Sequence, residues 1–251
     1  GRSLYDESPG ARRVFHEVDM ALGRPLAKLV FGGPQDVLQE TVNAQPAIMV
    51  VSLACVTAMQ EKMDDIELPQ PALMAGHSLG EYTALVAAGA LDVAAAAKLV
   101  RRRGELMQRA ADATPSGMAA LLGLTLDKAE EACAGTGAQV ANANSAEQVV
   151  IAGERAVLER AIDRAKEAGA RRAIPLEVAG AFHTEVMRSA QDELNEALAE
   201  LNLRAPAIPV IANTSGLPLT TVEGIREELG RQLCGCVYWQ RSVEYMAAQG
   251  V

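Results

Sequence analysis

The chain of 251 residues has little of what several classes of protein need. It carries no excess of basic residues, because 23 lysine and arginine residues stand against 32 aspartate and glutamate residues and the net charge is −9. Non-specific binding of nucleic acid depends on a basic surface that displaces counterions from the phosphates. The composition therefore argues against nucleic acid as a partner, and it leaves room for a local basic patch that faces an acidic partner.

Cysteines and long apolar runs are also scarce. Four cysteines, at positions 55, 133, 234 and 236, are too few and too widely spaced for a secreted disulfide framework. Cys234 and Cys236 lack the second Cys/His pair that a zinc site needs, so we expect no metal and reduced thiols. The N-terminus has no apolar signal-peptide core, and no uninterrupted apolar run approaches the length of a transmembrane helix. We expect a cytoplasmic protein without membrane contact.

The hydrophobic pattern predicts helices and a buried strand in the first part of the chain. Residues 45–63 indicate a buried helix with Pro46 near its first turn. Residues 71–77 form a short apolar run that is typical of a buried parallel strand, and helical periodicity follows up to Gly89. A further helix is expected over roughly 92–112, after an N-cap aspartate.

The pattern changes near Pro115, where six shorter elements follow in the order β-α-β-β-α-β. These elements are expected at 117–124, 125–135, 138–145, 147–154, 154–168 and 171–178. This order is that of the ferredoxin-like arrangement. We therefore predict an α/β protein in which a ferredoxin-like subdomain, 115–179, is inserted into a larger domain made of 1–114 and 180–251. A helix at about 184–201 and a strand at 208–213 are expected to follow.

Ser78 stands between two glycines in the stretch Gly76-His77-Ser78-Leu79-Gly80, after the expected strand and before the expected helix. A Gly-x-Ser-x-Gly order in this context is typical of a sharp turn that presents a nucleophilic serine. Backbone N–H groups at the start of the helix, that of Leu79 first among them, are placed to stabilise an oxyanion. Ser78 is therefore the candidate nucleophile.

A nucleophilic serine needs a base, and the chain has only three histidines. The side chain of His77 is expected to point away from that of Ser78, and His16 lies in an early helix of mixed polarity that favours a surface position. His183 follows a strand and precedes a helix, as catalytic loop residues often do, and is the candidate base by elimination. The aspartates between Ser78 and His183 are explained by helix capping and solvation; they are Asp92, Asp112, Asp127 and Asp163. A backbone carbonyl is therefore an alternative group to orient the imidazole of His183.

An arginine is expected to point inward from the helix at 92–112. At 100° per residue, Leu99, Leu106 and Ala110 define an apolar stripe, and Arg103 falls about 20° from its centre. Arg101 points to the opposite side. A buried guanidinium is costly unless it is paired, and its planar fork suits a carboxylate. The sequence therefore predicts an acyl substrate that carries a free carboxylate.

Five segments in this order resemble the bacterial malonyl-CoA:acyl-carrier-protein transacylases over essentially the whole chain. They are GHSLGEYTALVAAGAL, RRRGELMQ, NANSAEQVVIAG, GAFHTEVM and RQLCGCVYWQRSVEYMAAQGV. The resemblance implies an α/β-hydrolase-like large domain with a parallel sheet and an inserted ferredoxin-like subdomain. It also implies transfer of the malonyl group from malonyl-CoA, through a malonyl-serine, to the phosphopantetheine thiol of acyl carrier protein in fatty acid biosynthesis. No cofactor or metal is expected.

The resemblance also implies a role for each candidate site residue. Ser78 matches the acylated nucleophile, His183 the general base, and Arg103 the residue that binds the malonyl carboxylate. The other substrate-binding candidates are Leu79 (an oxyanion N–H), Gln232 (a backbone carbonyl that orients His183), His77, Asn144 and Phe182. Malonyl-selective polyketide acyltransferases have a Phe-His-Ser pattern, in which Thr184 replaces the serine here.

The family usually has an N-terminal GQGSQ segment, whose glutamine gives a second oxyanion N–H, and a C-terminal segment with Gly-Pro-Gly. We expect both to lie outside these 251 residues. Three alternatives stay open: an acyltransferase of polyketide synthesis, a serine thioesterase or hydrolase, and a non-enzymatic interaction scaffold. An inward arginine disfavours a hydrolase of neutral esters. A monomer is expected.

Overall fold

The computed structural model describes residues 1–63 and 70–251. Its contacts divide the chain into two compact units. The first unit consists of Gly1–Glu105, Glu200–Val210 and Leu219–Val222, and the second unit of Leu106–Ala199, Ile211–Pro218 and Glu223–Val251. The boundaries expected for an inserted subdomain, 115–179 within 1–114 and 180–251, stay a prediction.

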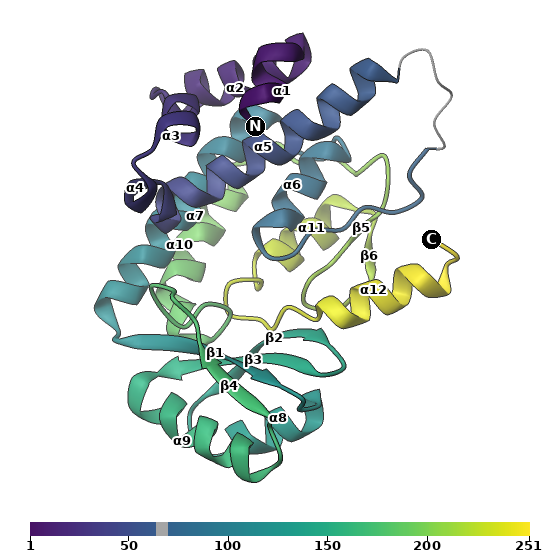
Figure 1. The fold of residues 1–251 in the computed structure, drawn as a ribbon. Coiled ribbons are helices and arrows are strands. Elements are labelled where there is room, and N and C mark those ends of the chain that lie inside the picture. Colours follow the sequence, from purple (N-terminus) through teal and green to yellow (C-terminus); the bar gives the residue numbers. More distant parts are fainter. Residues whose placement is uncertain (64–69) are drawn as a thin grey trace. The chain divides into compact units, whose positions relative to one another are not determined.

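The first unit is mainly helical (Figure 1). Its helices are α1 (Arg2–Glu7), α2 (Pro9–Leu22), α3 (Leu26–Gly32), α4 (Gln35–Gln39), α5 (Thr41–Lys62), α6 (Leu79–Ala87) and the first part of α7 (Val93–Ala113). Helix α5 is its core element and packs against α2 and α6. The expected helices after Ser78 and after Asp92 are confirmed, and the first of them ends before Gly89, whose φ is 76°.

Helix α2 turns one apolar face toward α5 because its buried residues recur at helical spacing. Ala11, Phe15 and Val18 are at most 1% exposed, and Ser8 caps the helix by accepting a hydrogen bond from the N–H of Ala11 at 3.0 Å. The ring of Phe15 packs against that of Phe31, with centroids 5.0 Å apart. Burial of an aromatic side chain of this kind contributes about 1.5–3 kcal/mol.

Helix α5 begins at Thr41 rather than at 45, so its expected start was wrong. A helical turn forms before Pro46, in which the N–H groups of Asn43 and Ala44 both donate to the Glu40 carbonyl at 2.8 Å. Pro46 therefore lies inside the helix rather than at its start. Among the described residues, α5 is the one helix long and apolar enough to span a membrane by length and composition. The core helix of a folded domain passes the same test.

The buried strand expected at 71–77 is wrong in its extent and burial. Of these residues, Met74 alone forms a β-bridge, which is parallel and pairs with Val210. The N–H of Met74 donates to the carbonyl of Pro209 at 2.9 Å. An extended segment counts as a strand only where neighbouring chains pair with its backbone groups, and the hydrophobic pattern alone cannot supply that information.

The second unit contains a four-stranded antiparallel sheet with two helices (Figure 1). Its elements are β1 (Ser116–Leu122), α8 (Leu126–Cys133), β2 (Gln139–Ser145), β3 (Gln148–Glu154), α9 (Arg155–Glu167) and β4 (Arg172–Pro175). The strand order is β2-β3-β1-β4, and β1 pairs antiparallel with both β3 and β4. The six elements expected from the sequence are confirmed in type and order.

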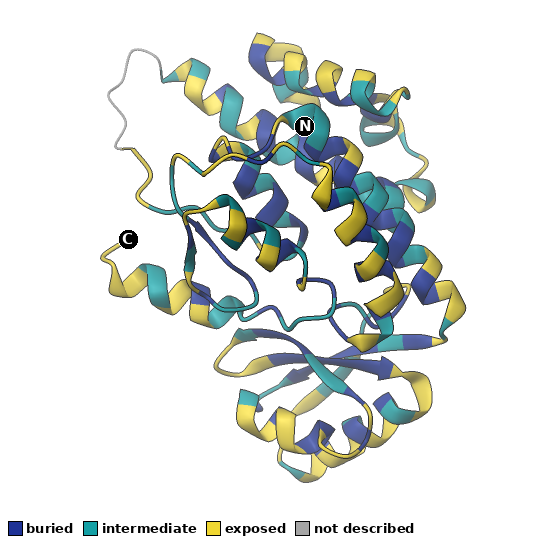
Figure 2. Ribbon diagram, turned by 180° about the vertical axis from the view of Figure 1, so that it is seen from behind, coloured by how far each residue is buried: buried dark blue, intermediate teal, exposed yellow. Residues whose placement is uncertain are grey.

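The two faces of this sheet carry separate apolar clusters. Residues of α8 and α9 pack on one face, where Leu121, Ile151 and Ala161 are fully buried. Figure 2 shows exposed residues on the opposite sides of these helices, as expected for amphipathic helices. On the other face, Ala181 is fully buried and Phe182 packs beside it. The residues that directly precede His183 are thus fixed to the sheet.

The remaining elements follow β4 along the chain. They are η1 (Glu185–Met187), α10 (Arg188–Ala199), β5 (Val210–Ile211), β6 (Pro218–Leu219), α11 (Val222–Leu229) and α12 (Trp239–Ala248). The expected helix at 184–201 is confirmed as η1 and α10, whereas the expected strand at 208–213 is reduced to the two residues of β5. Val237 forms a parallel bridge with Asn142 of β2, which fixes the chain between α11 and α12 to the sheet.

Candidate functional site

Ser78 stands at a sharp turn directly before α6. Its backbone has φ 53° and ψ −105°, and Leu79 is the first residue of the helix. A Cβ atom on Gly76 would lie 2.0 Å from the carbonyl oxygen of Gly80, whereas a Cβ on Gly80 would meet nothing within 4 Å. The first glycine of the motif is therefore required because the turn brings its backbone against that of Gly80.

Ser78 and His183 both have a positive φ, which strains a residue that carries a side chain. Within the part of the chain that the structure describes, they are the two non-glycine residues with positive φ, 53° and 60°. Such conformations cost about 1–3 kcal/mol each and cluster at functional sites. The sequence singled out the same two residues as nucleophile and base on independent grounds. His16, by contrast, is exposed on α2, as expected.

Arg103 of α7 is 1% exposed, which confirms that its side chain points inward from the helix. Its Nη2 donates to Oγ of Ser78 at 3.1 Å, and its Nη1 donates to Oε1 of Gln45 at 2.6 Å. The guanidinium also lies 5.3 Å from the centroid of the Tyr82 ring. Arg101 is instead paired with Glu105 at 3.1 Å and is partly exposed. The arginine and the serine therefore belong to one hydrogen-bonded cluster.

The close approach of two helices creates this cluster. A Cβ atom on Gly104 would lie 2.7 Å from the carbonyl oxygen of Thr41 and 2.8 Å from Cα of Val42. Only glycine at this position lets α7 approach the first turn of α5 so closely. Gln45 lies one turn further along α5, so the same approach brings its amide within reach of Arg103.

Burial is the main influence on the pKa of Arg103 and lowers it, because desolvation disfavours the charged guanidinium. Tyr82 and Glu81 act in the opposite direction, Tyr82 through its charge and a hydrogen bond and Glu81 through its charge. The hydrogen bonds from Arg103 to Gln45 and to Ser78 go to neutral oxygens. The cluster therefore holds a buried cation beside a serine hydroxyl.

In the second unit, His183 is 4% exposed and is held by a backbone carbonyl. Its Nδ1 lies 2.9 Å from the carbonyl oxygen of Gln232. Because a carbonyl oxygen only accepts, Nδ1 carries the proton and Nε2 is the basic nitrogen. This is the geometry of a base whose tautomer is selected by a carbonyl in place of a carboxylate.

The Gln232 carbonyl is itself fixed by side chains of α10 and α11. Gln191 is fully buried, and its Oε1 accepts the N–H of Leu233 at 3.0 Å. The carboxylate of Glu228, also fully buried, accepts from the N–H of Thr214 at 2.8 Å and from Arg231 at 3.1 Å. The turn that carries Gln232 is therefore held on both sides.

The loop before His183 is equally constrained. The hydroxyl of Thr184 donates to the carbonyl of Ala181 at 2.7 Å, and the N–H of Ala181 donates to Oγ of Ser116 at 3.1 Å. A Cβ on Gly180 would lie 2.6 Å from that of Ala111. A serine at position 184 has the same hydroxyl, so threonine preserves the hydrogen bond that closes this turn.

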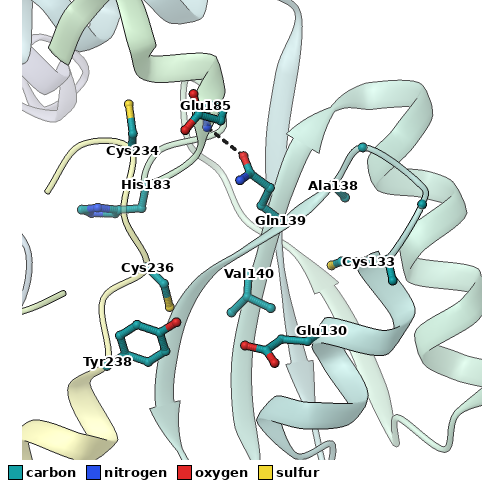
Figure 3. Close-up of a pocket in the computed structure, with 13 residues that line it drawn as sticks. Glu130, Cys133, Ala138, Gln139, Val140, His183, Glu185, Cys234, Cys236 and Tyr238 are labelled. Carbon is teal, nitrogen blue, oxygen red and sulfur yellow. Dashed lines mark hydrogen bonds between the residues drawn. The ribbon is translucent and has the colours of Figure 1, made fainter. Parts of the chain in front are cut away.

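A hollow of about 650 Å³ lies beside the backbone of His183 in the second unit (Figure 3). In this view the His183 ring points away from Gln139 and Val140. Three thiols line the hollow, those of Cys133, Cys234 and Cys236, and burial raises their pKa values to about 11, about 11 and about 12. Over the described residues, no group of three or more His, Cys, Asp or Glu side chains is arranged to hold a metal ion.

The other predicted residues divide between the two units. Leu79 is buried at the start of α6, and His77 is exposed. Asn144, near the end of β2, and Phe182 are both half-buried in the second unit. The sequence did not predict the roles of Gln45, Tyr82 and Gln191, because periodicity shows that a side chain faces inward but not which residue it meets there.

Comparisons with known proteins find relatives along almost the entire chain. A model of the family described as "Acyl transferase domain" matches residues 1–248. The malonyl CoA-acyl carrier protein transacylase of Bacillus subtilis (strain 168) is 42% identical over 258 aligned positions, which cover 100% of this chain and 79% of that protein.

Two solved structures are similar along almost the entire chain. An acyl carrier protein S-malonyltransferase from Vibrio cholerae has a TM-score of 0.93 at 42% identity, covering 99% of this chain and 81% of that one. A malonyl-transacylase in complex with a type II polyketide synthase acyl-carrier protein has a TM-score of 0.92 at 38% identity, covering 99% and 80%. The chain belongs to the acyl transferase domain family.

Proposed function

We propose that this chain transfers the malonyl group of malonyl-CoA to the phosphopantetheine thiol of acyl carrier protein, as an [acyl-carrier-protein] S-malonyltransferase of fatty acid biosynthesis. Relatives of this activity match the entire chain. The observation that carries the choice of acyl group is the 3.1 Å hydrogen bond between Arg103 and Ser78. In a malonyl thioester a single methylene separates the carboxylate from the reacting carbonyl carbon. A cation that binds this carboxylate must therefore lie directly beside the nucleophile.

In the proposed reaction Ser78 is the nucleophile and His183 the general base. Nε2 of His183 takes the proton of the Ser78 hydroxyl as Oγ attacks the thioester carbonyl carbon. The oxyanion is stabilised by backbone N–H groups at the start of α6, that of Leu79 first. The carbon–sulfur bond then breaks, CoA leaves with the proton from His183, and a malonyl ester remains on Ser78.

The second half of the reaction repeats these steps with a different thiol. His183 takes the proton of the phosphopantetheine thiol, the thiolate attacks the malonyl ester, and Ser78 recovers its proton as the leaving group. The Gln232 carbonyl keeps the proton of His183 on Nδ1 throughout, so that Nε2 acts in both halves. Asn144, Phe182 and His77 are proposed substrate contacts without an assigned step.

We also propose the finer description of the fold. The order β-α-β-β-α-β of β1 to β4 with α8 and α9, and the antiparallel order β2-β3-β1-β4, support a ferredoxin-like subdomain. The turn at Ser78 before α6 supports an α/β-hydrolase-like origin for the remainder. A cytoplasmic location, a monomeric state and action without a cofactor are retained as predictions.

The test is a transfer assay with purified chain, malonyl-CoA and phosphopantetheinylated acyl carrier protein. We expect the mass of the carrier protein to increase by one malonyl group, and we expect no transfer by Ser78→Ala. Release of free malonate at the rate at which malonyl-CoA is consumed, with an unmodified carrier protein, would instead support the thioesterase alternative. Carrier proteins of fatty acid and polyketide synthesis, tested side by side, decide which is the better acceptor.

A further inference from the structure

We infer that Gln45 is a specificity-determining residue: its neutral amide positions Arg103 without adding a negative charge that would compete with the substrate carboxylate. This inference rests on the proposed function and deepens it. It assigns a role to a residue of α5 that lies far from the Gly-x-Ser-x-Gly motif in the sequence and close to Arg103 in the fold.

The geometry fixes both ends of the guanidinium. Oε1 of Gln45 accepts from Nη1 of Arg103 at 2.6 Å, while Nη2 donates to Oγ of Ser78 at 3.1 Å. Gln45 is 6% exposed and Arg103 is 1% exposed, so water competes little for either group. Two hydrogen bonds at different nitrogens determine the orientation of a planar group, which a single bond does not.

The close packing of α5 against α7 holds Gln45 in a fixed position beside Arg103. The backbone of α5 touches α7 at Gly104, the neighbour of Arg103, and a side chain at that position would collide with Thr41. Pro46 directly follows Gln45 and restricts the backbone there. The face of the Tyr82 ring lies 5.3 Å from the guanidinium carbon. The amide of Gln45 is therefore presented from a fixed position.

The charge of this partner decides what Arg103 can bind. A glutamate at position 45 would have the same shape, but its carboxylate would form an ion pair with Arg103 and compete with the carboxylate of the substrate. Glu81 already acts on Arg103 through its charge and favours the guanidinium cation. A second carboxylate, at position 45 and in direct contact with Arg103, would make the net charge around the malonyl group negative.

The experiment compares Gln45→Glu with Gln60→Glu, a matched control on the exposed face of the same helix. KM and kcat are measured for transfer from malonyl-CoA and from acetyl-CoA. We expect Gln45→Glu to raise KM for malonyl-CoA roughly 10- to 100-fold, in line with the loss of a charge-assisted interaction, and not to raise KM for acetyl-CoA. The malonyl/acetyl ratio of kcat/KM falls by the same factor, and Gln60→Glu leaves it unchanged.

A second variant separates position from charge and remains informative even where Gln45→Glu fails to fold. Gln45→Met has a similar volume and no strong acceptor, so Arg103 keeps its charge but loses its support. We expect a rise in KM for malonyl-CoA that is smaller than in Gln45→Glu, and a correspondingly smaller fall in the malonyl/acetyl ratio of kcat/KM, because no competing carboxylate is introduced. An unchanged KM for malonyl-CoA in Gln45→Met, or an unchanged ratio in folded Gln45→Glu, overturns the inference alone. Absence of malonyl transfer by the unchanged chain overturns the proposed function, and the inference with it.

Discussion

Arg103 donates a hydrogen bond from Nη2 to Oγ of Ser78 at 3.1 Å, so a buried cation and a candidate nucleophile are direct neighbours. The two residues are 25 positions apart in the chain. The serine stands at the sharp turn before α6, and the arginine occupies the inward face of α7.

Arg103→Ala is expected to lower kcat/KM for malonyl-CoA roughly 100-fold or more, because the carboxylate loses its charge-assisted hydrogen bonds. Transfer from acetyl-CoA should fall far less, since an acetyl group has no carboxylate. Arg101→Ala is the matched control on the same helix, because Arg101 is partly exposed and paired with Glu105. Steady-state kinetics with both thioesters measure the effect. Equal losses for both substrates would speak against carboxylate recognition by Arg103.

Gly76→Ala and Gly80→Ala are expected to differ sharply in stability, although both alter the same motif. A methyl group at 76 collides with the backbone of Gly80, and we expect a loss of about 3 kcal/mol of unfolding free energy. A methyl group at 80 meets nothing within 4 Å and lies in a helix, where alanine is favoured over glycine by about 1 kcal/mol. Urea denaturation measures both. Similar stabilities would refute the tight turn.

Gln191→Leu is expected to act on kcat rather than on KM. The substitution removes the acceptor for the N–H of Leu233 and loosens the turn whose carbonyl orients His183. We expect kcat to fall by roughly 10-fold with a nearly unchanged KM for malonyl-CoA, because the base acts in the transition state. The exposed Gln148→Leu in the same unit is the control. A change in KM alone would contradict a role through His183.

The raised pKa values of two thiols predict a loss of stability in alkaline solution. Burial raises the pKa of Cys236 from 9.0 to about 12 and that of Cys133 from 9.0 to about 11. Because the unfolded chain ionises first, the folded state binds more protons between these values, and the unfolding free energy falls as pH rises above about 9. Denaturation at about pH 8 and about pH 10 should show a smaller fall in Cys236→Ala. An identical fall in that variant would contradict the assignment.

The sequence predicted the elements of the second unit well because each has a strong local signal. Short apolar runs mark the strands, and glycines such as Gly135 and Gly169, with φ of 71° and 104°, mark the helix ends. The segment at 71–77 was predicted less well, because its pairing depends on Val210, which is distant in the chain. The start of α5 was misplaced because proline usually marks a helix start and here lies inside one.

The candidate site, like the fold, was predictable only in part. Ser78 and His183 follow from motif order and from the scarcity of histidine, and the burial of Arg103 follows from the helical period. Gln45 and Gln191 could not be predicted, since each matters through a partner on another element. Local patterns report the environment of a side chain, whereas a hydrogen bond across the fold depends on how the helices pack.

The central claim is that Ser78 carries the malonyl group beside Arg103, and intact-protein mass spectrometry tests it most directly. The chain is incubated briefly with malonyl-CoA, with acetyl-CoA, and with malonyl-CoA after Ser78→Ala substitution, and circular dichroism confirms that each sample is folded. We expect a single malonyl adduct on the unchanged chain, little or no acetyl adduct, and none on Ser78→Ala. An adduct that survives Ser78→Ala, or equal labelling by acetyl-CoA, would contradict the account.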